Sequence, residues 1–251
     1  MTAHGTAHPV GRVHLAGRVH VWVVDFGDPR WDVDAAVARL SPAERERADR
    51  GAPPVRFRRV LLRSALRQVL GGLLDVPPAA VPISSVDGRP VVGGTRRDRR
   101  LQVSCSASGS IGLVGVAAGT AIGVDVEQVG DEDVADALAE GWLSPAESLL
   151  VERLAPGDRA RALTRAWVHK EAVLKAQGVG LRADPGALVT PIADRGRVGR
   201  WFLAPVPVTG GAVASVAAAR SLLHGRPPRV VSHRLSPGGD GHPGGGVRPD
   251  G

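Results

Sequence analysis

The chain has 251 residues, of which 43% are hydrophobic, and it carries a formal net charge of +7. This size and apolar content suit one large domain or two small ones with a buried core, and they exclude a wholly disordered chain. No apolar run is long enough for a membrane helix, and the single cysteine excludes an internal disulfide, so we expect a cytoplasmic protein with no membrane association.

The positive charge comes almost entirely from arginine. Either it reflects a compositional bias, or it attracts an acidic partner or a polyphosphate. Binding of single-stranded nucleic acid favours aromatic side chains among the basic ones, and this chain has three Phe and no Tyr. We therefore expect no nucleic-acid partner.

Both ends of the chain lack the periodic apolar pattern of a folded segment. Residues 1–17 also lack the charged and then apolar order of a signal peptide, so we expect none. Residues 223–251 are rich in Gly and Pro, too poor in apolar residues to offset the entropy of ordering. We expect a disordered tail at each end.

The first half contains a strand, two helices, a turn and two strands around a loop rich in Ser and Gly. The expected segments are Val19–Asp25, a helix that starts at Ser41, Arg56–Leu74, the turn Val86–Pro90, Leu101–Val103 and Ile111–Ala117. Ser41 is followed by Pro42 and Glu44, the order of a capped helix start. Apolar residues of the second helix recur on one face.

The second half repeats this order. The expected segments are the strand Ala121–Val129, a helix start at Ser144, a long helix from Asp158 to Gln177, and the strands Trp201–Val208 and Ala212–Ala219. Gly178 is suited to end the long helix. Chance could produce the two similar helix starts, because Ser-Pro-x-Glu is a common one.

We interpret the pattern as an α+β protein built from two pseudo-symmetric α+β subdomains packed side by side. The expected subdomains are residues 18–119 and 120–222.

The first chemical motif is Gly123–Glu127, which reads Gly-Val-Asp-Val-Glu. Residues two apart on a strand share a face, so Asp125 and Glu127 lie side by side. Two adjacent carboxylates repel each other unless a cation lies between them. Alone, the motif also fits an amphipathic strand with an acidic outer face.

The second motif is Trp167–Lys175, which reads Trp-Val-His-Lys-Glu-Ala-Val-Leu-Lys. On a helix, Trp167, Glu171 and Lys175 form one stripe. Alone, this also fits a surface Glu–Lys pair that contributes little stability. Combined with the first motif, it offers three carboxylates for Mg²⁺ and an ammonium group for a diphosphate, which suits attack on phosphorus.

In this order and spacing, the two motifs resemble the paired signature of the 4'-phosphopantetheinyl transferase superfamily. The two-half length is similar to that of the monomeric type, which acts on the carrier proteins of polyketide and nonribosomal peptide synthases. The resemblance covers about residues 19–220. Secondary similarities lie at Arg59–Arg63, Gly88–Pro90, Leu143–Glu147 and Gly178–Leu181.

The resemblance implies transfer of the phosphopantetheine group of coenzyme A to a serine of an acyl or peptidyl carrier protein. It implies an active site at the interface of the two subdomains, with the metal site carried by the second. The implied cofactor is Mg²⁺, bound by Asp125, Glu127 and Glu171. Glu171 would also be the base for the carrier serine. Lys175 would contact the phosphates of coenzyme A, an acidic carrier would be the protein partner, and the enzyme would be a monomer.

The resemblance also assigns the remaining contacts to coenzyme A. Arg89 would bind the nucleotide end, with Arg59 as a further candidate, and Ser106 would bind on the side of the 3'-phosphate. The family usually has His where this chain has Ala107, and residues 51–55 form a shorter stretch than usual. The missing histidine predicts coenzyme A binding weaker by about 1–3 kcal/mol, or compensation by a nearby Arg.

Two alternatives remain at this stage. Ala107 also fits a non-catalytic relative that binds coenzyme A or a carrier protein without turnover. The net charge alone would also fit an unrelated basic protein, for which salt-sensitive nucleic-acid binding would be the sign.

Overall fold

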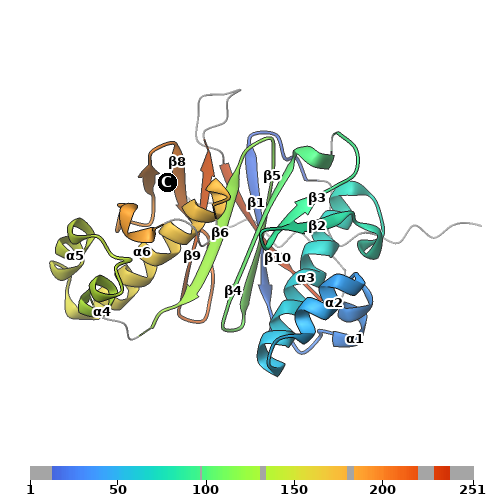
Figure 1. Ribbon diagram of the computed structural model, residues 1–251, viewed down its shortest axis with the longest axis horizontal. Helices are drawn as coiled ribbons and strands as arrows, with labels where there is room; N and C mark the ends of the chain where they lie inside the picture. Colours follow the sequence, from blue (N-terminus) through green and yellow to red (C-terminus); the bar gives the residue numbers. More distant parts are fainter. Residues whose placement is uncertain (1–12, 97, 131–133, 180–183, 220–228, 238–251) are drawn as a thin grey trace, which may run out of the picture.

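The computed structural model describes residues 13–96, 98–130, 134–179, 184–219 and 229–237. Two four-stranded sheets pack face to face, and one long helix covers the outer face of each sheet (Figure 1). The fold is therefore α+β, as the sequence predicts. No helix in these ranges is both long and apolar enough to cross a lipid bilayer.

The first sheet has the strand order β10-β1-β5-β4. Its strands are β1 (Arg18–Asp25), β4 (Leu101–Ser108), β5 (Ile111–Ala118) and β10 (Arg229–Leu235). Three helices and a hairpin accompany it: α1 (Val33–Ala38), α2 (Pro42–Asp49), α3 (Pro53–Leu74), β2 (Ile83–Val86) and β3 (Arg89–Val92). Two 3-10 turns are η1 (Pro78–Ala80) and η2 (Asp98–Arg100).

The second sheet has the strand order β6-β9-β8-β7. Its strands are β6 (Ile122–Gln128), β7 (Gly196–Val198), β8 (Trp201–Pro205) and β9 (Ala212–Ala219). Its helices are α4 (Val134–Ala139), α5 (Pro145–Glu152), α6 (Pro156–Gln177) and the 3-10 turn η4 (Pro185–Ala187).

Each half places a capped helix of 8 residues before a helix of 22 residues. Ser41 and Ser144 each accept a hydrogen bond from the third residue of their helix, whose Glu side chain binds back to the cap, so both predicted capping boxes are confirmed. The long helix α6 ends where predicted, because Gly178 adopts a φ of +80°.

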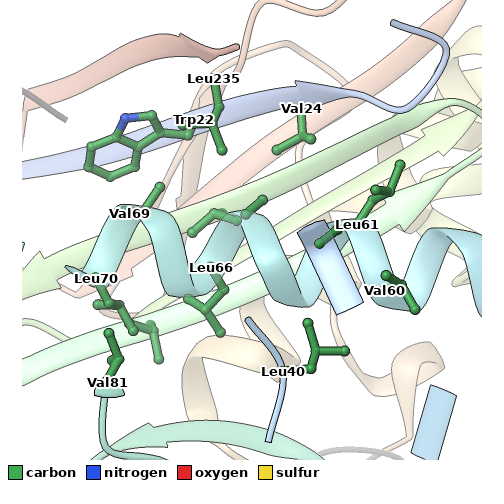
Figure 2. Close-up of a cluster of buried hydrophobic side chains, with 14 of the residues drawn as sticks. Trp22, Val24, Leu40, Val60, Leu61, Leu66, Val69, Leu70, Val81 and Leu235 are labelled. Carbon is green, nitrogen blue, oxygen red and sulfur yellow. The ribbon is translucent and has the colours of Figure 1, made fainter. Parts of the chain in front are cut away.

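The first core lies between α3 and the sheet that contains β1. Figure 2 shows Leu61 and Val69 on the side of α3 that faces Trp22 and Val24 of β1. A second core fills the space between the two sheets, where Val19, Val21, Leu113, Val124, Val126 and Val216 are all almost fully buried. A third contact joins α6 to the outer face of the second sheet.

The expectation of a disordered tail from residue 223 onward is wrong for Arg229–Leu235. This segment is strand β10, which pairs in parallel with β1 at the edge of the first sheet. Its partner is about two hundred residues away in the sequence, so local composition could not predict the pairing. Residues 1–12, 220–228 and 238–251 lie outside the described part of the chain, and the subdomain boundaries remain a prediction.

Candidate active site

Strand β6 lies between β4 of the first sheet and α6 of its own half. The segment expected as a loop rich in Ser and Gly is strand as far as Ser108, and its three alternating serines face β6. The bonds are Val124 N–H to Ser104 Oγ (3.0 Å), Ser106 Oγ–H to Asp125 Oδ1 (2.7 Å) and Gln128 N–H to Ser108 Oγ (3.2 Å). Serine hydroxyls thus link the two sheets at the site.

The glycine of the first motif allows α6 to approach β6 closely. A Cβ atom at Gly123 would overlap the carbonyl oxygen of Ala172 and crowd the Cβ of Lys175. Because Gly123 has no side chain, Lys175 can reach Asp125, two residues further along the strand.

Asp125 is the most deeply buried of the three acidic residues, with 1% of its surface exposed. Its Oδ1 accepts hydrogen bonds from Lys175 Nζ at 2.5 Å and from Ser106 Oγ at 2.7 Å, and Lys175 Nζ also donates to Ser106 Oγ at 3.1 Å. Burial raises the pKa of Asp125, against the opposing effect of Lys175. Its Oδ2 is buried and has no hydrogen-bond partner among the described residues.

Burial also raises the pKa of Glu127 and of Glu171. The negative charge of Asp125 raises the pKa of both carboxyls further, and the positive charge of Lys175 lowers the pKa of both. A hydrogen bond from Ser108 and the charge of Arg58 lower the pKa of Glu127. The three acidic residues of the two motifs therefore form one electrostatic cluster, in which Lys175 is the cation common to all three.

The described residues contain no group of three Asp, Glu, His or Cys side chains already close enough together to hold a metal ion. The donor set still fits a hard cation, because all three side chains offer oxygen and the buried Oδ2 of Asp125 lacks a partner. The structure brings Asp125, Glu127 and Glu171 into one neighbourhood, and their role as metal ligands stays a prediction.

A buried ion pair holds α6 beside the site. Lys170, which directly precedes Glu171, lies 2.8 Å from Glu147 of α5, and both side chains are fully buried. Lys170 Nζ also donates to the carbonyls of Pro185 and Leu188.

The other oxygen of Glu147 is equally well bound. Thr190 donates to Glu147 from its backbone N–H at 2.7 Å and from its hydroxyl at 2.8 Å. Although burial raises the pKa of Glu147, its bonds to Lys170, Ser144 and Thr190 outweigh this effect and leave the pKa below its usual value. The pair fixes the turn of α6 from which Glu171 projects.

A cavity of about 360 Å³ opens beside Glu127, between the end of β6 and the first half of α6. Trp142 and Trp167 form part of its wall and contact each other edge to face, with ring centres 5.2 Å apart. The cavity thus begins at a carboxylate of the first motif and runs along the aromatic residue of the second.

Comparison with known proteins supports the resemblance of the two motifs. Residues 121–201, which carry both motifs, match the model of the 4'-phosphopantetheinyl transferase superfamily. The chain is 31% identical to the 4'-phosphopantetheinyl transferase HetI of Nostoc sp. over 169 residues, which is 66% of this chain and 71% of HetI.

The chain belongs to the 4'-phosphopantetheinyl transferase superfamily. It is also 29% identical over 182 residues to slr0495 of Synechocystis sp., a protein named for the same activity, across 68% of this chain and 73% of that protein. The family assignment makes the protein an enzyme that transfers the phosphopantetheine group. The partners that the family implies are coenzyme A and a carrier protein.

The residues expected to bind coenzyme A are distributed around the transferase site. Ser106 is nearest, since it bonds both Asp125 and Lys175. Arg89, on β3, packs its guanidinium group against Gly178 at the end of α6. Arg59 is on the exposed side of α3, where its Nη1 donates to the carbonyl of Arg47 at 3.1 Å. Their contacts with coenzyme A remain predictions.

Ala107 is turned away from the carboxylates. It is on the opposite face of β4 from Ser106 and packs against the core of the first half, on the side of α3. A histidine here would therefore extend toward the first half and its arginine-rich helix, rather than toward the acidic cluster.

Three features of the transferase site go beyond what the sequence predicts. Arg58 acts on Glu127, and no pattern in α3 distinguishes it from the neighbouring arginines. Of the β4 serines only Ser106 was predicted as a site residue, although the alternation of Ser104, Ser106 and Ser108 is visible in the sequence. The pair of Glu147 and Lys170 joins α5 to α6, but nothing local indicates that they meet.

Proposed function

We propose that this enzyme transfers the 4'-phosphopantetheine group of coenzyme A, with Mg²⁺, to a serine of an acyl or peptidyl carrier protein of a polyketide or nonribosomal peptide synthase. The observation that carries the proposal is the acidic cluster of Asp125, Glu127 and Glu171 around Lys175, with one buried carboxylate oxygen unpartnered. Such a cluster carries more negative charge than its single lysine can offset, which favours a bound cation.

Asp125, Glu127 and Glu171 would hold the Mg²⁺ ion, which when bound supplies charge neutralisation for the diphosphate of coenzyme A. The raised pKa of Glu171 suits it to accept the proton of the carrier serine. The serine oxygen then bonds to phosphorus, the phosphoanhydride bond breaks, and adenosine 3',5'-bisphosphate leaves. Lys175 stabilises the negative charge that develops on the phosphates.

Basic side chains of the first half would bind the nucleotide and attract the carrier. Arg58, Arg59 and Arg63 follow one another along α3, and Arg58 is near enough to influence Glu127. An acidic carrier domain would be steered toward this surface by charge, so its association should weaken at higher salt.

The test is a carrier-loading assay with coenzyme A, Mg²⁺ and a panel of acyl and peptidyl carrier proteins, read by intact-protein mass spectrometry. We expect one carrier to gain the mass of a single phosphopantetheine group. Asp125→Ala and Glu171→Ala should abolish the gain, whereas Glu152→Gln, on the exposed side of α5, should leave it intact. Loading that persists in Glu171→Ala would contradict the assigned base.

A further inference from the structure

The cavity beside Glu127 has a composition that bears on which form of coenzyme A the enzyme accepts. Its wall includes Glu127, Glu140, Trp142, Thr164 and Trp167. Two tryptophans, a leucine and an alanine supply apolar surface, and no Lys, Arg or His is among the lining residues that the structure describes. At about 360 Å³ it is at the small end of the range of ligand pockets, roughly 300–1,000 Å³.

The charges of the wall are negative. Glu127 is at the end next to the acidic cluster, where a bound cation would neutralise it, and Glu140 is exposed just beyond α4. Thr164 donates its hydroxyl hydrogen to the carbonyl of Ala160 at 2.9 Å, so it presents only lone pairs to a ligand. An anionic group in the cavity would face Glu140, with no cation among the described residues of the wall.

Glu127, at one end of the cavity, is influenced by two basic groups. Lys175 is bound to Asp125 at 2.5 Å, and Arg58 approaches from the first half, where it acts on Glu127. Neither is part of the cavity wall. The cavity is thus electrostatically distinct from the basic surface that would hold the phosphates.

We propose that this cavity receives the thiol end of coenzyme A and favours thioesters with a short, uncharged acyl group over those that end in a carboxylate. This inference rests on the proposed function. When the diphosphate is held at the acidic cluster and Lys175, the pantetheine arm leaves it beside Glu127, which is the mouth of the cavity. Transfer forms the serine–phosphorus bond and breaks the phosphoanhydride, so the thioester passes intact to the carrier.

The matched substrates are propionyl-CoA and malonyl-CoA, whose acyl groups differ by a terminal methyl against a terminal carboxylate. We expect kcat/KM to be at least about fivefold higher for propionyl-CoA, a ratio that corresponds to one partly screened charge interaction. Glu140→Lys should reduce this ratio to near one or invert it. Glu152→Lys makes the same change of charge on α5, outside the cavity, and should leave the ratio unchanged.

Coenzyme A is measured in parallel, which separates the two hypotheses. Efficient loading from coenzyme A with equal rates for the two thioesters would overturn the cavity assignment and leave the transferase function standing. A ratio that Glu152→Lys shifts as much as Glu140→Lys would also overturn it, because net charge alone would then explain the preference. Should no carrier be loaded, calorimetric titration of the wild type with both thioesters replaces the rates, and equal affinities would refute the inference.

Discussion

Lys175 Nζ lies 2.5 Å from Asp125 Oδ1, although 50 positions separate the two residues in the sequence. This contact joins the strand motif to the helix motif and depends on the bare backbone at Gly123, over which the lysine stem passes. Asp125 is almost fully buried, which disfavours its ionised form, and the charge of Lys175 stabilises that form.

Replacing this lysine should affect the reaction more than the binding of coenzyme A. We expect Lys175→Met to lower kcat of carrier loading by about 10²–10³, because the cation no longer meets the charge that develops on the phosphates. Lys175→Arg keeps the charge and should retain more activity. Steady-state kinetics with varied coenzyme A give both constants, and an unchanged kcat with a raised KM would show that Lys175 only anchors the substrate.

Ala107 offers a gain-of-function test. Its side of β4 faces the first half, so Ala107→His should add a charge-assisted contact to a phosphate of coenzyme A. The expected gain is about 1–3 kcal/mol, which corresponds to a dissociation constant lower by roughly 5- to 150-fold in calorimetry. Ala193→His, at an exposed site in the second half, is the control. An unaltered affinity in Ala107→His would mean that coenzyme A does not pass this face.

The pair of Glu147 and Lys170 should be essential for stability. Lys170→Met leaves a fully buried, uncompensated carboxylate, and we expect a loss of about 3–5 kcal/mol in the free energy of unfolding. For a chain of this size, that corresponds to a melting temperature lower by roughly 6–20 °C.

A double-mutant cycle then separates the pair from its neighbours. Glu147→Gln combined with Lys170→Met should destabilise by less than the sum of the single changes, since neither charge is then left alone. Glu46→Gln removes one partner of an exposed pair with Arg50 and should have little effect. Strict additivity in urea unfolding would show that the two residues act independently.

The sequence predicts those features that depend on near neighbours. The alternation of Asp125 and Glu127, the capping serines Ser41 and Ser144, and the end of α6 at Gly178 all follow from spacing over a few residues. The meeting of the two motifs, by contrast, was predicted from their resemblance to the family signature and not from spacing alone.

Contacts between distant segments could not be predicted in the same way. Strand β10 looked like a tail because its pairing with β1 is invisible in local composition, and Lys170 looked like an ordinary helix residue because Glu147 meets it only in the folded chain. The cavity is a further example, since its wall combines β6, α6 and the segment after α4. These parts of the structure depend on packing between segments that are distant in the sequence, which the spacing of apolar residues does not reveal.

In addition to the backbone pairing, two histidines join strand β10 to β1, which should make its attachment sensitive to pH. His20 Nε2 donates to the carbonyl of His14 at 3.0 Å, so its Nδ1 must accept the 2.8 Å bond from Nε2–H of His233. The rings of His20 and His233 also stack with each other, and that of His233 stacks with Trp22. A proton added to His20 Nδ1 would oppose the bond that joins the two strands.

Burial lowers the pKa of both histidines, and Arg18 lowers that of His20 further. The unfolded chain, with histidine pKa values near 6.5, therefore binds more protons than the folded one just below that pH. This contribution to stability is complete above 6.5 and is lost as the pH falls.

Replacing His233 should weaken this dependence on pH. His233→Phe keeps a ring beside Trp22 but cannot titrate, so urea unfolding between pH 5 and 8 should give a shallower dependence of stability on pH for this variant than for the wild type. His169, whose burial lowers its pKa to about 4, is unchanged in both proteins and cancels from the difference. Identical slopes for the two proteins would mean that the histidine pair does not hold β10 in a pH-dependent way.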